Sequence, residues 1–267
     1  MTHVQTPNVA GLFYPGEADA LRRDVQHFLQ EAKVSEGPAP KALIAPHAGY
    51  VYSGPIAGSA YAQLAPVREH IQRVIVLAPS HRVGFRGIAV STAECFETPL
   101  GDIPVDLESV EQISRLPAVG VLDKAFAGEH ALEVQLPFLQ IALTEFKLVP
   151  LIVGEAEPGE VAKVLETLWG DEKTLIVISS DLSHYQDYDS AMAHDRHTTN
   201  KIEALDDDLA YGDACGRNPI RGLLRAARDH GLQAATLDLR NSGDTSGARD
   251  RVVGYGAFVF RRDPGNA

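Results

Sequence analysis

The sequence predicts an α/β fold with a single central sheet, mixed but mostly parallel, and helices on both of its faces. Three apolar runs of strand length support this prediction, and each of them ends in a histidine. Segments with the spacing of amphipathic helices lie between the runs, and this alternation is typical of a parallel sheet. The three runs with their histidines are residues 42–47, 74–81 and 175–184.

The first half of the chain is expected to alternate helices with strands. Apolar residues recur at helical spacing near the N-terminus, and a later segment rich in alanine suits a helix that packs closely on the sheet. The predicted elements are a helix over 20–32, a helix over 54–64, a strand over 73–78, a short strand over 87–91 and a helix over 105–116.

The second half continues the pattern and ends in two strands. Pro137 lies inside a helical stretch and lacks a backbone donor, so a kink or a fresh start is expected there. Asn218-Pro219 is typical of an N-cap followed by proline at the first helical position. The predicted elements are helices over 129–143, 159–169, 187–209 and 220–229 and strands over 148–153, 174–179, 234–239 and 252–260.

The composition favours one α/β domain over residues 1–267, with 45% hydrophobic residues to build its core. The net charge of −12 opposes a nucleic-acid or anionic membrane partner. No apolar run approaches the roughly 20 residues that span a bilayer, and the polar start lacks the build of a secretion signal. A cytoplasmic location is therefore expected, with Cys95 and Cys215 as reduced thiols.

The histidines at the strand ends are the first candidate site residues. If the three runs are neighbouring parallel strands, their imidazoles emerge at one edge of the sheet, where open α/β folds bind ligands. His47 and His81 lie in matching positions behind prolines, and a neutral imidazole on a rigid strand end is a good ligand for iron, copper, zinc or nickel. The alternative for each is a loop histidine bonded to a backbone carbonyl.

Cys215 is the candidate for the third metal ligand. It precedes a predicted helix N-terminus and lies near Arg217, and both features lower the pKa of a thiol. The alternative is a small buried apolar residue, and this is the interpretation for Cys95.

Two further pairs are candidates for the same cleft. Asp181 and His184 share one loop and suit acid/base chemistry or contact with a substrate, although His184 competes with Cys215 as the third ligand. Glu129 and His130 open a predicted helix, where His130 either lines the cleft or caps its own helix. The sequence contains no Walker A segment, GxGxxG fingerprint, GxSxG elbow or HExxH pair, which argues against the corresponding enzyme classes.

Five motifs in this chain resemble those of the Memo family, and the resemblance extends from residues 10–14 to 254–257. It implies a fold like that of the class III (LigB-type) extradiol dioxygenases, which are non-haem iron enzymes that open catechol rings. The motifs are IAPHAGY at 44–50, APSH at 78–81, EHALEVQLP at 129–137, SSDLSH at 179–184 and CGRNPI at 215–220.

The resemblance also assigns site residues. It implies that His47 and His81 face a metal, that His184 occupies the position of the dioxygenases' catalytic histidine, and that Cys215 replaces a carboxylate ligand. A soft thiolate in place of a hard carboxylate shifts the site toward copper or thiolate-bound iron, so ring cleavage does not carry over. The cleft-lining residues that we expect are Tyr50, Glu129 and His130.

The resemblance implies partners as well. Eukaryotic members are metal-binding redox or signalling proteins that engage phosphotyrosine peptides in this cleft, whereas prokaryotic members accompany a radical-SAM protein and an AMMECR1-domain protein. This chain is similar to the prokaryotic type, and it has Gln135 and Asn218 where animal members have histidine.

The sequence therefore predicts a mononuclear iron or copper site, with zinc as a further option, that acts on a small molecule or a partner-bound substrate. Its ligands would be His47, His81 and Cys215, with Asp181 and His184 beside them. One rival is a non-enzymatic module that holds a peptide or an anionic ligand in the same cleft. Another is a hydrolase that uses zinc-activated water.

Overall fold

The computed structural model describes residues 3–262. Three adjacent parallel strands form the centre of its larger sheet. β9 (Thr174–Ser179) lies between β2 (Ala42–Ala45) and β3 (Arg73–Pro79) and pairs in parallel with both. Ala45 is opposite Ser179, the last residue of β9, so these strands end side by side. The expected neighbourhood of the three histidine-bearing runs is thereby confirmed.

Further strands extend this centre into a mixed sheet, as predicted. The order is β10-β12-β2-β9-β3-β8-β4-β7, and β11 pairs with β12 off this path. β8 continues the parallel set beside β3, whereas β12 runs antiparallel to β2 and β4 antiparallel to β8. The bounds of these strands are β4 Ile88–Val90, β7 Val119–Val121, β8 Lys147–Val153, β10 His184–Gln186, β11 Leu232–Asn241 and β12 Val252–Arg262.

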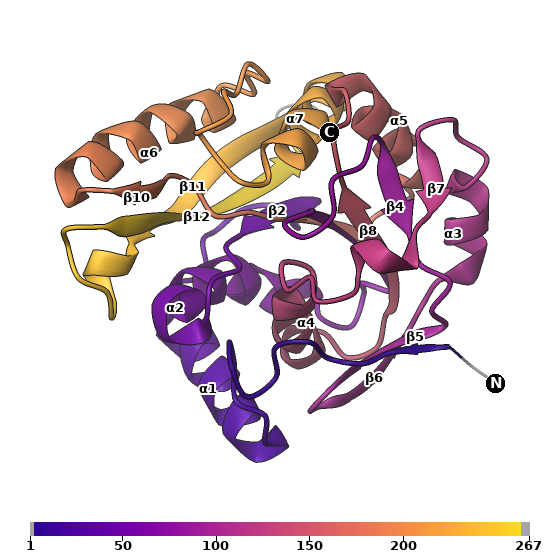
Figure 1. Cartoon of the computed structure of the whole chain (residues 1–267), viewed down its shortest axis with the longest axis horizontal. Coiled ribbons are helices and arrows are strands. Elements are labelled where there is room, and N and C mark those ends of the chain that lie inside the picture. The colour runs from indigo at the N-terminus through magenta and orange to yellow at the C-terminus, as the bar shows by residue number, and fades with distance from the viewer. Residues whose placement is uncertain (1–2, 263–267) are drawn as a thin grey trace.

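Helices cover both faces of the sheet (Figure 1). Alternate residues of each strand point to opposite faces, so both faces carry apolar side chains that the helices bury. Leu175 and Val177 of β9 join one apolar cluster, and Ile176 and Ile178 join the other. The first cluster is covered by α1 (Ala18–Glu31), α2 (Tyr50–Tyr61) and α4 (Leu136–Ala142). The second is covered by α3 (Leu107–Ile113), α5 (Pro158–Leu168), α6 (Tyr188–Glu203) and α7 (Arg217–Asp229).

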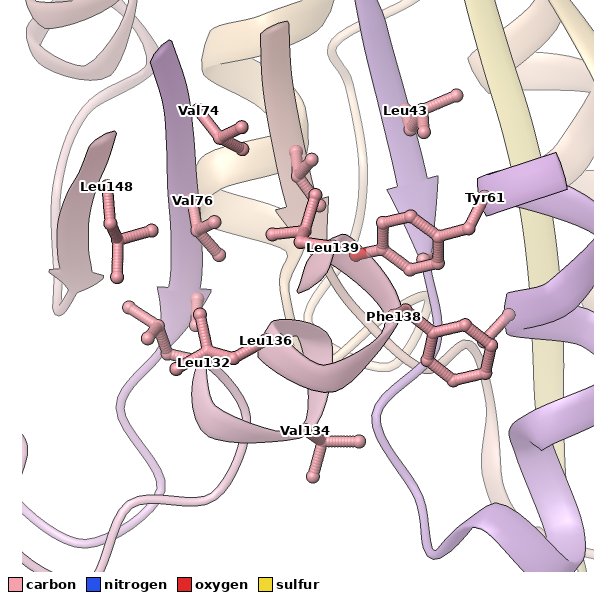
Figure 2. Packing of buried hydrophobic residues seen from close by; sticks show 14 of the residues in the cluster. Leu43, Tyr61, Val74, Val76, Leu132, Val134, Leu136, Phe138, Leu139 and Leu148 are labelled. Carbon is pink, nitrogen blue, oxygen red and sulfur yellow. The ribbon is translucent and has the colours of Figure 1, made fainter. Parts of the chain in front are cut away.

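The first cluster brings α2 and α4 together over the strands (Figure 2). Tyr61, the last residue of α2, stacks on Phe138 of α4 with ring centroids 5.1 Å apart. Both rings are buried beside Leu43 of β2. This packing places the N-terminal end of α4 close to the ends of the central strands.

Helix ends differ from the predictions at several places; the helix predicted over 54–64, for example, begins at Tyr50. Pro137 marks a fresh start, as expected, but α4 follows one 3₁₀ turn (η3, Glu133–Gln135), and residues 129–132 are not helical. The helix predicted over 187–209 ends at Glu203, because Leu205 adopts a left-handed conformation with φ 54° that closes the C-terminus. Finally, α7 begins one residue before Asn218, which donates to the carbonyl of Gly154 and caps nothing.

A small second sheet was not predicted, because its strands are short and rich in polar residues. It consists of β1 (Val4–Gln5), β5 (Cys95–Thr98) and β6 (Gly101–Pro104). Cys95 is half-buried on β5. Short 3₁₀ turns complete the connections, namely η1 (Ala62–Val67), η2 (Asp123–Ala125) and η4 (Ser242–Asp244). Within residues 3–262, no helix has both the length and the apolar character needed to cross a membrane.

Candidate functional site

A cleft of about 1210 Å³ opens at the carboxyl edge of the central strands. This edge is where the sequence places the strand-end histidines, and all of them reach it. The predicted site residues that line the cleft are His47, His81, His130, Asp181, His184 and Cys215.

Three imidazoles converge in this cleft. His47 follows β2, His81 follows β3, and His130 lies in the turn before η3. One ring nitrogen of each lies within 4.8 Å of the other two. The rings of His81 and His130 stack at 5.0 Å between centroids, and His47 stands nearly perpendicular to both. His130 thus belongs to a three-histidine group rather than serving only as a cap or a cleft wall.

His47 is held from two sides. Its backbone N–H donates to Asp181 Oδ1 over 2.8 Å, and its ring Nδ1 lies 2.8 Å from Ser179 Oγ. The residue is only 2% exposed. Burial lowers the pKa of His47 well below its usual value, and the neighbouring His81 and His130 add to the effect. The ring is therefore neutral at physiological pH.

Glu129 orients His81. Its Oε1 accepts from His81 Nδ1 over 2.9 Å, and its Oε2 accepts from the His81 backbone N–H over 2.6 Å. Burial alone would raise the pKa of Glu129, but the hydrogen bond from His81 and the backbone N–H groups outweigh it and bring the pKa to about 2. Because a carboxylate can only accept, Nδ1 of His81 carries a proton, and Nε2 is the ring nitrogen that can ligate a metal ion.

The donor set fits a transition-metal ion. Burial also lowers the pKa of His130, so this ring joins His47 as a neutral donor. A carboxylate on the far nitrogen of a ligand histidine is the usual outer support of a metal site, and Glu129 occupies the corresponding position on His81. Imidazole ligands suit iron, copper, zinc and nickel rather than magnesium or calcium.

Cys215 lies beside this group, in front of α7. Its Sγ is 3.3 Å from His47 Nε2 and accepts the backbone N–H of Asp181 over 3.3 Å. The prediction of a lowered thiol pKa is wrong. Burial raises the pKa strongly, and the carboxylate of Asp181 raises it further, while Arg217 lies 4.0 Å from Glu155. The sulfur is a thiol that contacts the three-histidine group through His47.

Asp181 and His184 occupy different positions in the cleft. Asp181 is buried, and burial raises the pKa of its carboxyl above the usual value. His184 is exposed, and its Nδ1 donates to the carbonyl of Leu182 over 2.8 Å, which leaves Nε2 free for a ligand. Tyr50 is buried, with its hydroxyl donating to Val134, and Tyr52 lines the cleft in its place.

The rim of the cleft carries three arginines, and the sequence pointed only to Arg217 among them. Arg82, Arg217 and Arg251 line the cleft of a chain whose net charge is −12. Arg251 Cζ lies 4.5 Å from the ring of Tyr185, an exposed residue with φ 62°. Tyr185 is distinguished only by its strained backbone conformation next to His184, and backbone strain cannot be predicted from a sequence.

Comparison with known proteins provides independent information. A family model described as Memo-like protein matches residues 5–259. A MEMO1 family protein from Aquifex aeolicus is 36% identical over 96% of this chain and 99% of its own length. A MEMO1 family protein from Methanopyrus kandleri is 34% identical over 97% of this chain and 99% of its own length.

Proposed function

The chain belongs to the Memo family, and from this premise we propose that it binds one iron or copper ion through His47, His81 and His130. The ion would serve redox chemistry on a small molecule or a partner-bound substrate. One observation carries the proposal: three imidazoles, two of them with lowered pKa values, bring ring nitrogens within 4.8 Å of one another. A bound ion of this kind supplies electron transfer and polarisation of a ligand oxygen.

The remaining cleft residues have distinct roles in this proposal. Glu129 keeps His81 oriented through its Nδ1. The exposed His184 exchanges a proton with the substrate at Nε2, since its Nδ1 is held by the Leu182 carbonyl. Cys215 is the candidate for a fourth ligand, because its sulfur lies 3.3 Å from His47 Nε2. A sulfur donor favours copper and iron, and zinc in the hydrolase alternative.

Metal analysis of protein purified without a histidine tag tests the proposal. We expect one equivalent of iron or copper in the wild type and its loss in His47→Ala, His81→Ala and His130→Ala. His230→Ala is the matched control, because that ring stacks on Trp169 and lines no part of the cleft. Stoichiometric metal in all three cleft variants would remove the assignment, and zinc in the wild type would favour the hydrolase alternative.

The second candidate function is that of a non-enzymatic binding module whose occupied cleft is recognised by partner proteins. The three rim arginines of an acidic chain support it, because they offer charge to an anionic ligand. Calorimetric titration with a phosphotyrosine peptide, with and without chelator, separates the two functions. Equal peptide affinity with and without chelator would favour the binding module. In that case Arg251→Ala should lose the peptide affinity, and Arg225→Ala should keep it.

A further inference from the structure

A chain of buried hydrogen bonds leads from α2 to the imidazole of His47. Tyr61 reaches from α2 toward α4 (Figure 2), and its hydroxyl donates to Gln135 Oε1 over 2.7 Å. Gln135 Nε2 donates to Ser179 Oγ over 2.7 Å, and Ser179 Oγ lies 2.8 Å from His47 Nδ1. Every side chain in this chain is at most 2% exposed, so no solvent competes for its hydrogen bonds.

The side-chain amide of Gln135 has only one workable orientation. Its nitrogen lies 3.0 Å from the carbonyl oxygen of Pro46 and 3.4 Å from that of Ala45. A carbonyl oxygen can only accept, so an amide oxygen in that place would face two acceptors. Tyr61 satisfies the amide oxygen on the other side. Gln135 therefore donates to Ser179.

The single proton of the Ser179 hydroxyl determines which ring nitrogen of His47 is protonated. The hydroxyl has one proton, and the carbonyl oxygen of Ala131, 2.6 Å away, can only accept it. One lone pair of Ser179 Oγ receives the Gln135 amide proton. The lone pair that is left faces His47 Nδ1, and a hydrogen bond forms there only if Nδ1 donates.

We propose that Ser179 and Gln135 are positioning residues that hold His47 in the tautomer with its proton on Nδ1. Nε2 then presents its lone pair to the cleft, toward Cys215 Sγ at 3.3 Å and the other two imidazoles. The preference is built into the protein before any ion arrives. The use of this tautomer in metal binding rests on the proposed function, but the tautomer itself does not.

Long-range ¹⁵N–¹H correlation NMR of the chelator-treated wild type tests the inference without any substitution. The signals of His47 are assigned by their loss in His47→Gln. We expect a protonated Nδ1 and an unprotonated Nε2 at neutral pH. A proton on Nε2 would overturn the inference. Conversely, Nδ1–H in a protein that binds no metal would contradict the proposed function and leave this inference standing.

Substitutions connect the tautomer to metal binding. Ser179→Ala removes the acceptor of the His47 proton, so the Nδ1–H fraction falls and Zn²⁺ affinity, measured by calorimetry, weakens about 10- to 100-fold. Gln135→Met frees the Ser179 hydroxyl and has a smaller effect in the same direction. Ser109→Ala, which removes a buried hydroxyl outside the lining of the cleft, changes neither readout. Unchanged tautomer and affinity in folded Ser179→Ala would contradict the positioning role.

Discussion

At the scale of single residues, proton affinities differ sharply between atoms in contact. Burial lowers the pKa of His47 and raises that of Cys215, although Sγ and Nε2 are only 3.3 Å apart. The charged form of each group is penalised, so the neutral thiol can donate to the neutral imidazole. In the proposed site the same pair would become two metal ligands once the thiol proton is lost, because ligation requires a thiolate.

Cys215→Ser tests whether the sulfur is a ligand. Cobalt-loaded wild type should show a sulfur-to-metal charge-transfer band in its absorption spectrum, and Cys215→Ser should lack the band while still binding cobalt through the three imidazoles. Cys95→Ser, on β5 and outside the cleft, should keep the band. A wild-type spectrum without the band would show that the Cys215 sulfur does not ligate the metal ion.

At the scale of secondary-structure elements, helix ends and helix contacts decide stability. Asp106 caps α3 by accepting the backbone N–H of Ser109, and it also accepts from Arg73 Nε over 2.8 Å. On the same side of the sheet, α5 crosses α7 at Gly222, where a Cβ atom would lie 2.3 Å from Val161. Both features are local interactions that a single substitution removes.

Asp106→Asn should reveal a pH-dependent contribution. Burial raises the pKa of Asp106, but the hydrogen bonds from Ser109 and Arg73 bring it below its ordinary 3.8. Because the folded pKa is the lower one, the stabilisation is complete above about pH 4 and is lost as the pH falls. We expect a loss of about 0.2–1 kcal/mol at pH 7, because asparagine keeps the cap but removes the charge that pairs with Arg73. Urea denaturation should show the difference from wild type shrinking at pH 3; a constant difference would contradict the mechanism.

Gly222→Ala should destabilise the protein by about 1–3 kcal/mol, because the added methyl group forces α7 away from α5. Gly159→Ala in α5 is the matched control, since its Cβ atom would meet nothing closer than 3.6 Å. That substitution should be neutral or slightly stabilising. Thermal denaturation of both variants measures the contrast, and similar melting temperatures would refute the close crossing.

At the scale of the whole molecule, the site exists only in the folded chain. Its side chains come from segments as far apart as His47 and Cys215, and they meet because β2, β9 and β3 end at one edge. An ion that binds this arrangement and not the unfolded chain must stabilise the fold. Metal affinity and stability are therefore coupled.

The size of this coupling depends on how far the ion concentration exceeds the dissociation constant. Zn²⁺ at 100 times its dissociation constant should raise the free energy of unfolding by about 2.7 kcal/mol. His47→Ala should lose the increase, whereas His230→Ala should retain it. Denaturant titrations with and without Zn²⁺ measure both. An undiminished increase in His47→Ala would mean that the stabilising ion binds elsewhere.

The sequence by itself determined the α/β class, the shared edge of the three histidine-bearing strands and the family. Apolar periodicity carries the class and the strand positions because it records which faces of each element are buried, whereas the family follows from the five motifs. The sequence could predict that His47 and His81 lie close together, because their strands flank the same parallel strand and end at the same edge of the sheet. Its least accurate predictions were helix ends, such as the one at Leu205, where backbone conformation rather than periodicity decides.

Only the tertiary structure decided the chemistry of the cleft. The predicted helix over 129–143 is not helical at His130, and the turn there carries its ring to His47 and His81. The raised pKa of Cys215 and the proton donors and acceptors around Ser179 depend on neighbours from distant segments. Proton affinity is a property of such neighbours, and a linear sequence does not contain them until the chain has folded.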